Sequence, residues 1–332
     1  MNPMSPREVF DRFAGTTALV VGDVMIDAYL WGRVDRISPE APVPVVHVTE
    51  RSARLGGAAN VALNLHALGA TPVVVSVTGN DAEADRMHRI LQEHHLPTSG
   101  LVRSAHRRTT VKTRVISGHQ HIVRVDEEIE TDLIAEDEQA LLAHVERLIA
   151  ELDPAVIVLE DYNKGVLTEA VITGIIALAK AKGIPTAVDP KKKNFFAYRG
   201  VDLFKPNLKE LREGAKMDVH AGDIASVRVA VGVLEERLGN GASLITLSEH
   251  GVYAHRGNEE HLIPAHRRTI ADVSGAGDTV IAVAALCLAV GLDLRTLAAW
   301  SNLAGGLVCE QVGVMPIDRD ALLAECEQLD RS

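Results

Sequence analysis

Apolar runs of strand length alternate with amphipathic, helix-type segments along most of the 332-residue chain. Examples are the run from Thr17 to Ile26, VVVSVTG at 73–79 and VIVLE at 156–160. Parallel strands that are buried on both faces give such continuous runs, and strand–helix alternation is typical of α/β proteins. Aromatic residues make up only 3% of the chain, so the core must be largely aliphatic, which suits these strands. The pattern therefore predicts a mostly parallel sheet covered by helices.

Two stretches interrupt this alternation. Residues 28–55 hold three prolines and alternate in β fashion, which predicts short strands outside the main sheet. Residues 107–126 contain two alternating runs around Ser117 and Gly118, a pattern typical of a hairpin. The chain has no fixed-period repeat and no long polar linker. We interpret residues 1–332 as a single domain from which both stretches project as a small β lid.

Charge and cysteine content exclude several classes of protein. The chain has 34 basic and 45 acidic residues, a net charge of −11, which argues against a broad surface for nucleic acid or anionic lipid. Its three cysteines form no CxxC pair, which fits a reducing compartment. The longest apolar run, Val280 to Val290, is well short of the about 20 residues that a membrane span needs. We expect a cytoplasmic protein without nucleic-acid partners or membrane insertion.

Polar residues stand at the ends of several predicted strands. Carboxyl ends of parallel strands meet at one edge of a sheet, where ligands bind, so we expect these side chains to face one crevice. Taken singly, each of them could instead cap a helix or form a turn. They are Asp27, Asp161, Asp189, Asn207 and Ser248.

The segment IADVSGAGDTVI at 270–281 joins a glycine-rich turn to the start of an apolar helix. Gly275 and Gly277 allow a ligand to approach the backbone, and the free N–H groups of a helix start attract negative charge. Asp278 is unusual there, because its carboxylate would repel a phosphate unless it is needed to accept a proton. The first interpretation is therefore a base for phosphoryl transfer. The alternative is that Asp278 only complements the helix dipole, which in either case favours an ionised carboxylate at neutral pH.

Other nucleotide and metal motifs are missing from the sequence. No GxxxxGK motif followed by Ser or Thr is present, and a dinucleotide-binding fingerprint would need glycine where Val280 stands. His119 and His121 lie two residues apart on a predicted strand, for which we expect a structural or solvated role rather than metal binding. The sequence thus favours neither a P-loop ATPase nor a dehydrogenase.

Several segments together resemble the ribokinase-type (PfkB) carbohydrate kinases, and the resemblance spans nearly the whole chain. Within that family it is closest to the branch that phosphorylates heptose 7-phosphate for lipopolysaccharide core precursors. One departure is Asn163, where relatives usually have glycine, so the conformation of its loop stays open. The segments are GDVMIDAYLWGRVDRISPEAPVPVV, GGAAN, EDYNKGVL, VDPKKKN, FKPNLKE and DVSGAGD.

The resemblance implies a ribokinase-like three-layer sandwich with a β lid and a kinase dependent on ATP and Mg²⁺. Its reaction would phosphorylate the anomeric 1-hydroxyl of D-glycero-D-manno-heptose 7-phosphate to the 1,7-bisphosphate. Asp278 would be the base, and Gly275, Ala276 and Gly277 would hold the transferring phosphoryl group. Glu210 would help to hold Mg²⁺ through water, and K⁺ is a further candidate cofactor.

By the same resemblance, the sugar would contact Asp27, Gly56, Gly57 and Asn60. Asp161 and Asp189 are substrate candidates from their positions at strand ends, and Lys112, Arg124 and Lys193 are candidates because the 7-phosphate needs cations. ATP would contact Asn207, Lys209, Glu210, Ser248, Gly251, Gly275 and Gly277. Further candidates for the 7-phosphate are Lys191, Lys192, Arg33 and Arg36, since a phosphate needs cations.

The resemblance also implies a homodimer that pairs through the lid. Bifunctional members add a nucleotidyltransferase domain with an HxGH motif, which this sequence lacks, so we expect the reaction to stop at the bisphosphate. Two rival hypotheses are a PfkB kinase for another sugar and a non-catalytic sugar-phosphate sensor. A sensor would need neither Asp278 nor the acid of the NxxE motif, Glu210.

Overall fold

The computed structural model describes residues 4–118 and 120–331, and in this part of the chain nine strands form the main sheet. Their order is β13-β12-β11-β10-β9-β8-β1-β4-β5. Neighbours from β11 to β5 are parallel, whereas β12 and β13 add an antiparallel edge. The strands are β1 (Thr17–Gly22), β4 (Thr71–Gly79), β5 (Leu101–Ser104), β8 (Val156–Glu160), β9 (Thr186–Asp189), β10 (Leu203–Phe204), β11 (Ala242–Thr246), β12 (Val252–Arg256) and β13 (Glu259–Ile263).

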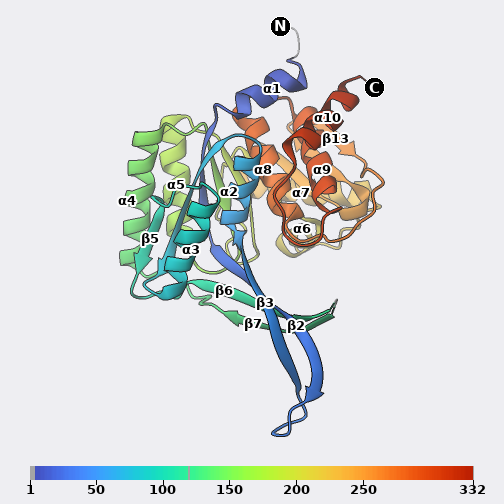
Figure 1. Cartoon of the computed structure of the whole chain (residues 1–332). Helices are drawn as coiled ribbons and strands as arrows, with labels where there is room; N and C mark the ends of the chain where they lie inside the picture. Colours follow the sequence, from blue (N-terminus) through green and yellow to red (C-terminus); the bar gives the residue numbers. More distant parts are fainter. Residues whose placement is uncertain (1–3, 119, 332) are drawn as a thin grey trace.

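Helices cover both faces of this sheet (Figure 1). Alternate residues of β1 enter two separate cores: Ala18 and Val20 pack on one face, Leu19 and Val21 on the other. The first core includes α1 (Pro6–Phe13), α2 (Ala58–Ala67), α3 (Ala82–Glu93), α8 (Ala276–Ala289), α9 (Leu294–Val308) and α10 (Arg319–Asp330). The second includes α4 (Ala135–Leu152), α5 (Glu169–Lys182), α6 (Leu208–Ala215) and α7 (Ile224–Leu238). The predicted three-layer α/β arrangement is confirmed.

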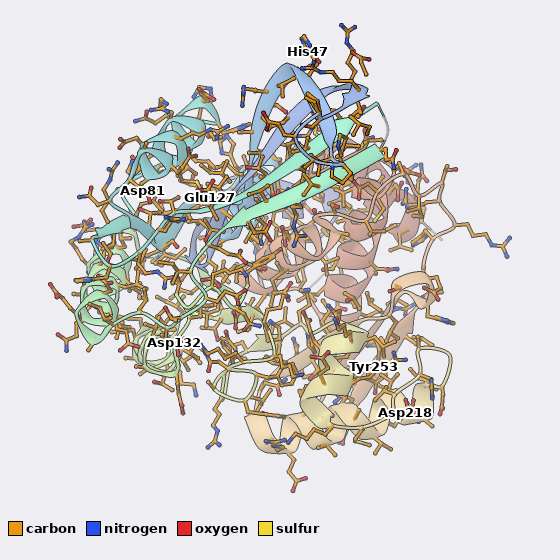
Figure 2. All side chains as sticks on the ribbon, turned by 90° about the horizontal axis from the view of Figure 1, so that it is seen from below. His47, Asp81, Glu127, Asp132, Asp218 and Tyr253 are labelled. Carbon is orange, nitrogen blue, oxygen red and sulfur yellow. The ribbon has the colours of Figure 1, made fainter. Side chains whose placement is uncertain are left out.

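The predicted lid is a second sheet with the order β3-β2-β6-β7. It consists of β2 (Val24–Ile37), β3 (Pro44–Gly57), β6 (Thr110–Ser117) and β7 (Gln120–Glu127). Figure 2 shows His47 near its outer end and Glu127 where β7 ends. The prediction of short strands was wrong, because β2 and β3 have 14 residues each. The prolines lie in the 38–43 connection and at the first residue of β3, where they break no hydrogen-bond ladder.

The first strand also ends earlier than predicted. β1 stops at Gly22 and is followed by Asp23, while Asp27 lies within the lid strand β2. The apolar run continues because Val24 and Ile26 are buried as well, so hydrophobicity alone could not mark where the chain leaves one sheet for the other. The acid at the carboxyl end of β1 is therefore Asp23, not Asp27.

None of the helices within residues 4–118 and 120–331 has the length and hydrophobicity needed to span a bilayer.

Candidate active site

The glycine-rich turn leads directly into α8. Gly275 has a φ of 82°, in the left-handed region that favours glycine, and a Cβ atom there would lie 3.1 Å from Nδ2 of Asn60. No side chain caps the helix start; the Ala276 N–H donates weakly to the carbonyl oxygen of Val273 at 3.3 Å, and N–H groups at such a start attract negative charge. A Cβ on Gly277 would lie 3.6 Å from Oδ2 of Asp189. The first turn of α8 thus faces the end of β9.

Asp278 lies in that first turn and is only 5% exposed. Asn60 Nδ2 donates to its Oδ2 at 2.6 Å, and the hydroxyl of Tyr162 donates to its Oδ1 at 2.8 Å. Burial raises the pKa of Asp278 to about 6, although both hydrogen bonds favour the ionised form. At pH 7 the ionised form therefore predominates by about ten to one.

Asn60 reaches Asp278 from the start of α2. Gly57 precedes this helix with a φ of 60°, and a Cβ atom on it would lie 2.3 Å from the carbonyl oxygen of Asp23. A Cβ atom on Gly56 would lie 2.4 Å from Oδ2 of Asp27. Both glycines are thus required by the backbone packing that brings Asn60 to Asp278.

Two lysines, the half-buried Lys191 and the buried Lys205, follow the ends of β9 and β10. Lys205 Nζ pairs with Oδ2 of Asp189 at 2.7 Å, and these residues are 2% and 4% exposed. Lys191 Nζ pairs with Oε1 of Glu210 at 2.7 Å and lies 3.4 Å from Oδ1 of Asp189. Burial lowers the pKa of Lys191, but Asp189 and Glu210 outweigh it and hold this pKa above its ordinary value. Lys191 therefore stays charged beside Asp189 and Glu210.

Asn207 and Glu210 form a capping box at the start of α6. Asn207 Oδ1 accepts from the Glu210 N–H at 2.9 Å, and Glu210 Oε2 accepts from the Asn207 N–H at 2.8 Å. Only Oε1 of Glu210 faces Lys191. The NxxE spacing therefore has a local structural role as well as a place in the cluster.

Glu160, the last residue of β8, is a buried carboxylate without a partner. It is 0% exposed, and within the described part of the chain neither carboxylate oxygen has a hydrogen bond. Burial, with the nearby charges of Asp189 and Asp278, raises its pKa well above the ordinary value. Sequence reasoning singled out the next residue, Asp161, and missed Glu160.

The carboxylates around Asp278 form no ready-made metal cage in the described residues, yet they could hold Mg²⁺. Among residues 4–118 and 120–331, no three His, Cys, Asp or Glu side chains gather as a metal cage. Mg²⁺ is commonly bound by only one or two carboxylates together with water and substrate phosphates. The unpartnered oxygens of Glu160 and the position of Glu210 fit that mode of binding.

One face of the lid carries two guanidinium groups. The Cζ atoms of Arg54 and Arg114 each lie 5.5 Å from the centre of the Tyr29 ring. Arg114 pairs with Asp27, which is 5% exposed, and Arg54 donates to the carbonyl oxygen of Val314 at 3.0 Å. A Cβ atom on Gly275 would in turn lie 3.3 Å from Val314. This face of the lid therefore adjoins the α8 start.

Several basic residues that were predicted to contact the sugar phosphate instead form ion pairs with nearby carboxylates. Lys112 pairs with Asp126 and Glu128, and Arg124, which is exposed, also pairs with Asp126. Lys193 pairs with Asp132 at 2.8 Å. Among the described residues, Lys193 has no contact with the cluster around Asp278. Lys191 is thus the member of the lysine run that enters the cluster.

Asp161 accepts hydrogen bonds from the Asn163 N–H at 2.7 Å and the Tyr198 hydroxyl at 2.8 Å. Its role in the structure is therefore to hold its own loop.

Of the predicted nucleotide residues after β10 and β11, Glu210 contacts Lys191 and Asn207 caps α6, whereas Lys209, Ser248 and Gly251 contact none of these groups in the described part of the chain. Ser248 has a φ of 53° in a short 3₁₀ turn, and Lys209 is exposed. Gly251 has a φ of 88°, and a Cβ atom there would lie 2.0 Å from the carbonyl oxygen of Ile263. Gly251 is thus required by the turn itself. His121 is exposed, and His119 lies outside the described residues.

Besides Glu160, sequence reasoning missed five further residues that the fold brings to this region. Lys205 had a signal, because it directly follows the short apolar strand of FKPN. The others gave none, since their partners lie far away in the chain; Tyr162 and Asp278, for example, are 116 residues apart. The five are Asp23, Arg54, Arg114, Tyr162 and Lys205.

A base carboxylate beside a helix start and two lysines, one buried and one half-buried, can take a proton from a hydroxyl and stabilise a transferring phosphoryl group. The fold and this arrangement define a phosphotransferase of the α/β class.

Comparison with known proteins agrees with this class. The model of the pfkB family of carbohydrate kinases matches residues 16–320. The chain is 41% identical over 327 residues to the bifunctional protein HldE of Citrifermentans bemidjiense, covering 97% of this chain and 66% of that protein. Phosphofructokinase-2 of Escherichia coli in complex with potassium gives a TM-score of 0.78 at 19% identity, covering 95% of this chain and 99% of that one. Arabidopsis thaliana ribokinase complexed with ribose and ATP gives 0.72 at 17% identity, covering 94% and 99%.

The chain belongs to the pfkB family of carbohydrate kinases. The resemblance to ribokinase-type kinases and the ribokinase-like fold are confirmed. The chain spans 66% of the length of this HldE relative.

The pKa of Asp278 predicts how activity depends on pH. If Asp278 accepts the substrate proton, only its ionised form is active, so kcat/KM should fall tenfold per pH unit as the pH drops below about 6. Initial rates between pH 4.5 and 8 at saturating ATP would measure this fall, the acid limb of the pH–rate profile. An acid limb near pH 4, the ordinary pKa of an aspartate, would contradict the raised pKa of Asp278.

Proposed function

We propose that this kinase phosphorylates the anomeric 1-hydroxyl of D-glycero-D-manno-heptose 7-phosphate to give the 1,7-bisphosphate, in the synthesis of lipopolysaccharide core precursors. The observation that carries the proposal is Asp278, buried at the α8 start and opposite a lid face with two guanidinium groups. The RISPEAPVPVV and EDYNKGVL segments and the HldE relative support the heptose. A cytoplasmic location is part of this proposal, because the three cysteines are free, buried thiols.

In this proposal Asp278 accepts the proton of the 1-hydroxyl as that oxygen attacks the γ-phosphorus. The N–H groups of Gly275, Ala276 and Gly277 hold the charge of the transferring phosphoryl group. Lys205, whose Nζ would lie 3.8 Å from a Cβ atom on Gly277, lies where this charge develops. Asn60 holds the carboxylate of Asp278 from the other side.

Kinases of this family use ATP and a divalent metal, and we propose Mg²⁺ for this chain. Glu160 and Glu210 would hold the ion, at least partly through water, and a bound Mg²⁺ would neutralise charge on the phosphates. Asn207, Lys209, Ser248 and Gly251 would contact the nucleotide. K⁺ remains a candidate activator, because the similar phosphofructokinase-2 was solved with potassium.

For the sugar phosphate, we propose that Asp27 accepts hydrogen bonds from sugar hydroxyls beside Gly56 and Gly57. Arg54 and Arg114 are the strongest candidates for the 7-phosphate, because guanidinium groups bind phosphate through two hydrogen bonds and these two flank one ring. Lys112 is paired opposite Asp27 on β6, and Arg124 is paired opposite Arg114 on β7, so both extend the same face. We propose an indirect part in sugar-phosphate binding, through the shape of their loops, for Asp161, Asp189 and Lys193.

A panel of sugars tests the substrate. In a coupled assay of ADP release, heptose 7-phosphate should have the highest kcat/KM, and heptose without the phosphate should lose roughly 10-fold or more through KM, as expected for lost charged hydrogen bonds. Fructose 6-phosphate and ribose are the matched controls. A higher kcat/KM for either control would refute the heptose assignment and favour the rival kinase.

The Asp278→Asn variant tests the base. We expect turnover to fall by about 10² to 10⁴ or more, while sugar-phosphate binding in calorimetry stays largely intact. Asp293→Asn is the control, because Asp293 caps α9 outside the site and should affect stability only. Near-normal turnover of Asp278→Asn would show that Asp278 is not the base. If the wild-type protein binds the sugar phosphate fully but shows no turnover, the result would favour a non-catalytic sugar-phosphate sensor.

We also propose that the protein forms a homodimer through the lid. Ile37, Val43, Val123 and Val125 are each 49 to 61% exposed on the lid, and β3 and β7 are open edge strands. A second lid would cover these apolar groups.

Light scattering at micromolar concentration should then give twice the 35.7 kDa chain mass. Val123→Glu should shift the protein towards monomer, whereas Val229→Glu, at a 56% exposed valine of α7, should not. Monomeric wild-type protein would rule the dimer out.

A further inference from the structure

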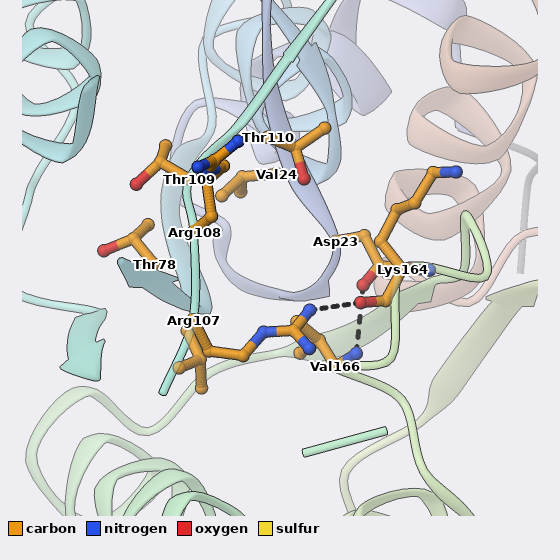
Figure 3. A pocket seen from close by; sticks show the side chains of 10 residues that line it. Asp23, Val24, Thr78, Arg107, Arg108, Thr109, Thr110, Lys164 and Val166 are labelled. Atoms are coloured by element: carbon orange, nitrogen blue, oxygen red, sulfur yellow. Dashed lines mark hydrogen bonds between the residues drawn. The ribbon is translucent and has the colours of Figure 1, made fainter. Parts of the chain in front are cut away.

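A buried carboxylate outside the reacting groups fixes the loop at residues 161–166, between β8 and α5. Asp23 is 1% exposed at the end of β1. It accepts hydrogen bonds from the N–H groups of Tyr162 at 2.8 Å, Lys164 at 3.0 Å and Val166 at 3.1 Å. Figure 3 shows Asp23 beside Lys164 and Val166. One side chain thus determines the path of the whole loop.

Asn163 gives this loop its turn. Its φ of 56° lies in the left-handed region, which asparagine tolerates better than most residues other than glycine. Its N–H group donates to Oδ1 of Asp161 at 2.7 Å. Asparagine in place of glycine therefore keeps the turn conformation that the sequence left open.

The loop brings Tyr162 to the base. Its hydroxyl donates to Oδ1 of Asp278 at 2.8 Å, while Lys191 Nζ lies 5.3 Å from the centre of its ring. Asn60 holds the other oxygen, Oδ2, so the carboxylate is fixed from two sides.

Arg107 ties the same loop to the lid. It lies just before the lid strand β6, and its guanidinium group donates to the carbonyl oxygens of Thr131, at 2.7 Å, and of Lys164. Figure 3 shows this side chain extending towards Asp23 and Lys164. The position of Tyr162 therefore depends on contacts that begin at the lid.

We propose that Tyr162 is a positioning residue for the catalytic base, held in place by Asp23. A hydroxyl that donates to a carboxylate stabilises its ionised form and fixes its orientation. Tyr162 keeps its own proton throughout, while the proton of the sugar hydroxyl passes to Asp278. This inference rests on the proposed role of Asp278 as the base.

The test compares Tyr162→Phe with wild type in pH–rate profiles. Losing a hydrogen bond to a charged group should lower kcat about 10-fold or more and move the acid limb of kcat/KM to higher pH by about one pH unit. KM for the sugar phosphate should change less than about threefold. Thermal unfolding of each variant verifies that it is folded.

Tyr198→Phe is the matched control. Tyr198 is also buried, at 0% exposure, and its hydroxyl donates to Oδ2 of Asp161 at the same 2.8 Å, but it does not touch Asp278. Its acid limb should stay at the wild-type pH. An unmoved limb in Tyr162→Phe, or an equal shift in both variants, would overturn the proposal.

Asp23→Asn tests the anchoring of the loop. One oxygen that accepts N–H bonds is lost, so the acid limb should move in the same direction, and combining it with Tyr162→Phe should add little further shift. Independent, additive shifts would contradict the linkage through Tyr162. If Asp278→Asn stays active, the proposed base itself fails; if that variant is inactive while Tyr162→Phe keeps the wild-type limb, only this inference fails.

Discussion

The arrangement of the site follows from an imbalance of buried charge. Asp189, Asp278, Glu160 and Glu210 are each at most 8% exposed, and the buried or half-buried cations that contact them are Lys191 and Lys205. A buried charge without compensation is costly, so an excess of carboxylates persists only where protons or ligand cations offset it. The raised pKa values of Asp278 and Glu160 are one expression of this excess. A divalent ion accompanying ATP would be another source of compensation.

The same excess of buried carboxylates explains why the helix start alone does not determine the protonation state of Asp278. An isolated first-turn carboxylate would have a lowered pKa, but burial of Asp278 acts in the opposite direction and is the larger effect. The hydrogen bonds from Asn60 and Tyr162 limit the rise. The result is a carboxylate that is mostly ionised at neutral pH yet basic enough to accept a proton.

Much of the fold could be predicted from local patterns. The alternation of strands and helices and both lid excursions were found, because periodicity and turn residues are local signals. Asp278 could be singled out because glycines and an acid at a helix start are adjacent in sequence.

What could not be predicted depends on distant contacts. The end of β1 was missed because residues buried in either sheet are equally apolar. Arg114 meets Asp27 across 87 residues, and Asn60 meets Asp278 across 218, so no spacing in the sequence marks either pair. For the lysine run, composition could not distinguish Lys191, which enters the cluster, from Lys193, which does not.

Asp23 is the only residue between β1 of the main sheet and β2 of the lid. The lid therefore joins the main sheet at the residue whose carboxylate holds the 161–166 loop. Any change in the tilt of the long lid strands would act at this residue. Exchange of lids between related kinases would have to preserve this one-residue junction, whereas the distal connection at residues 38–43 can vary in length without disturbing it. The lid that carries Arg54 and Arg114 and the loop that carries Tyr162 thus meet at a single residue.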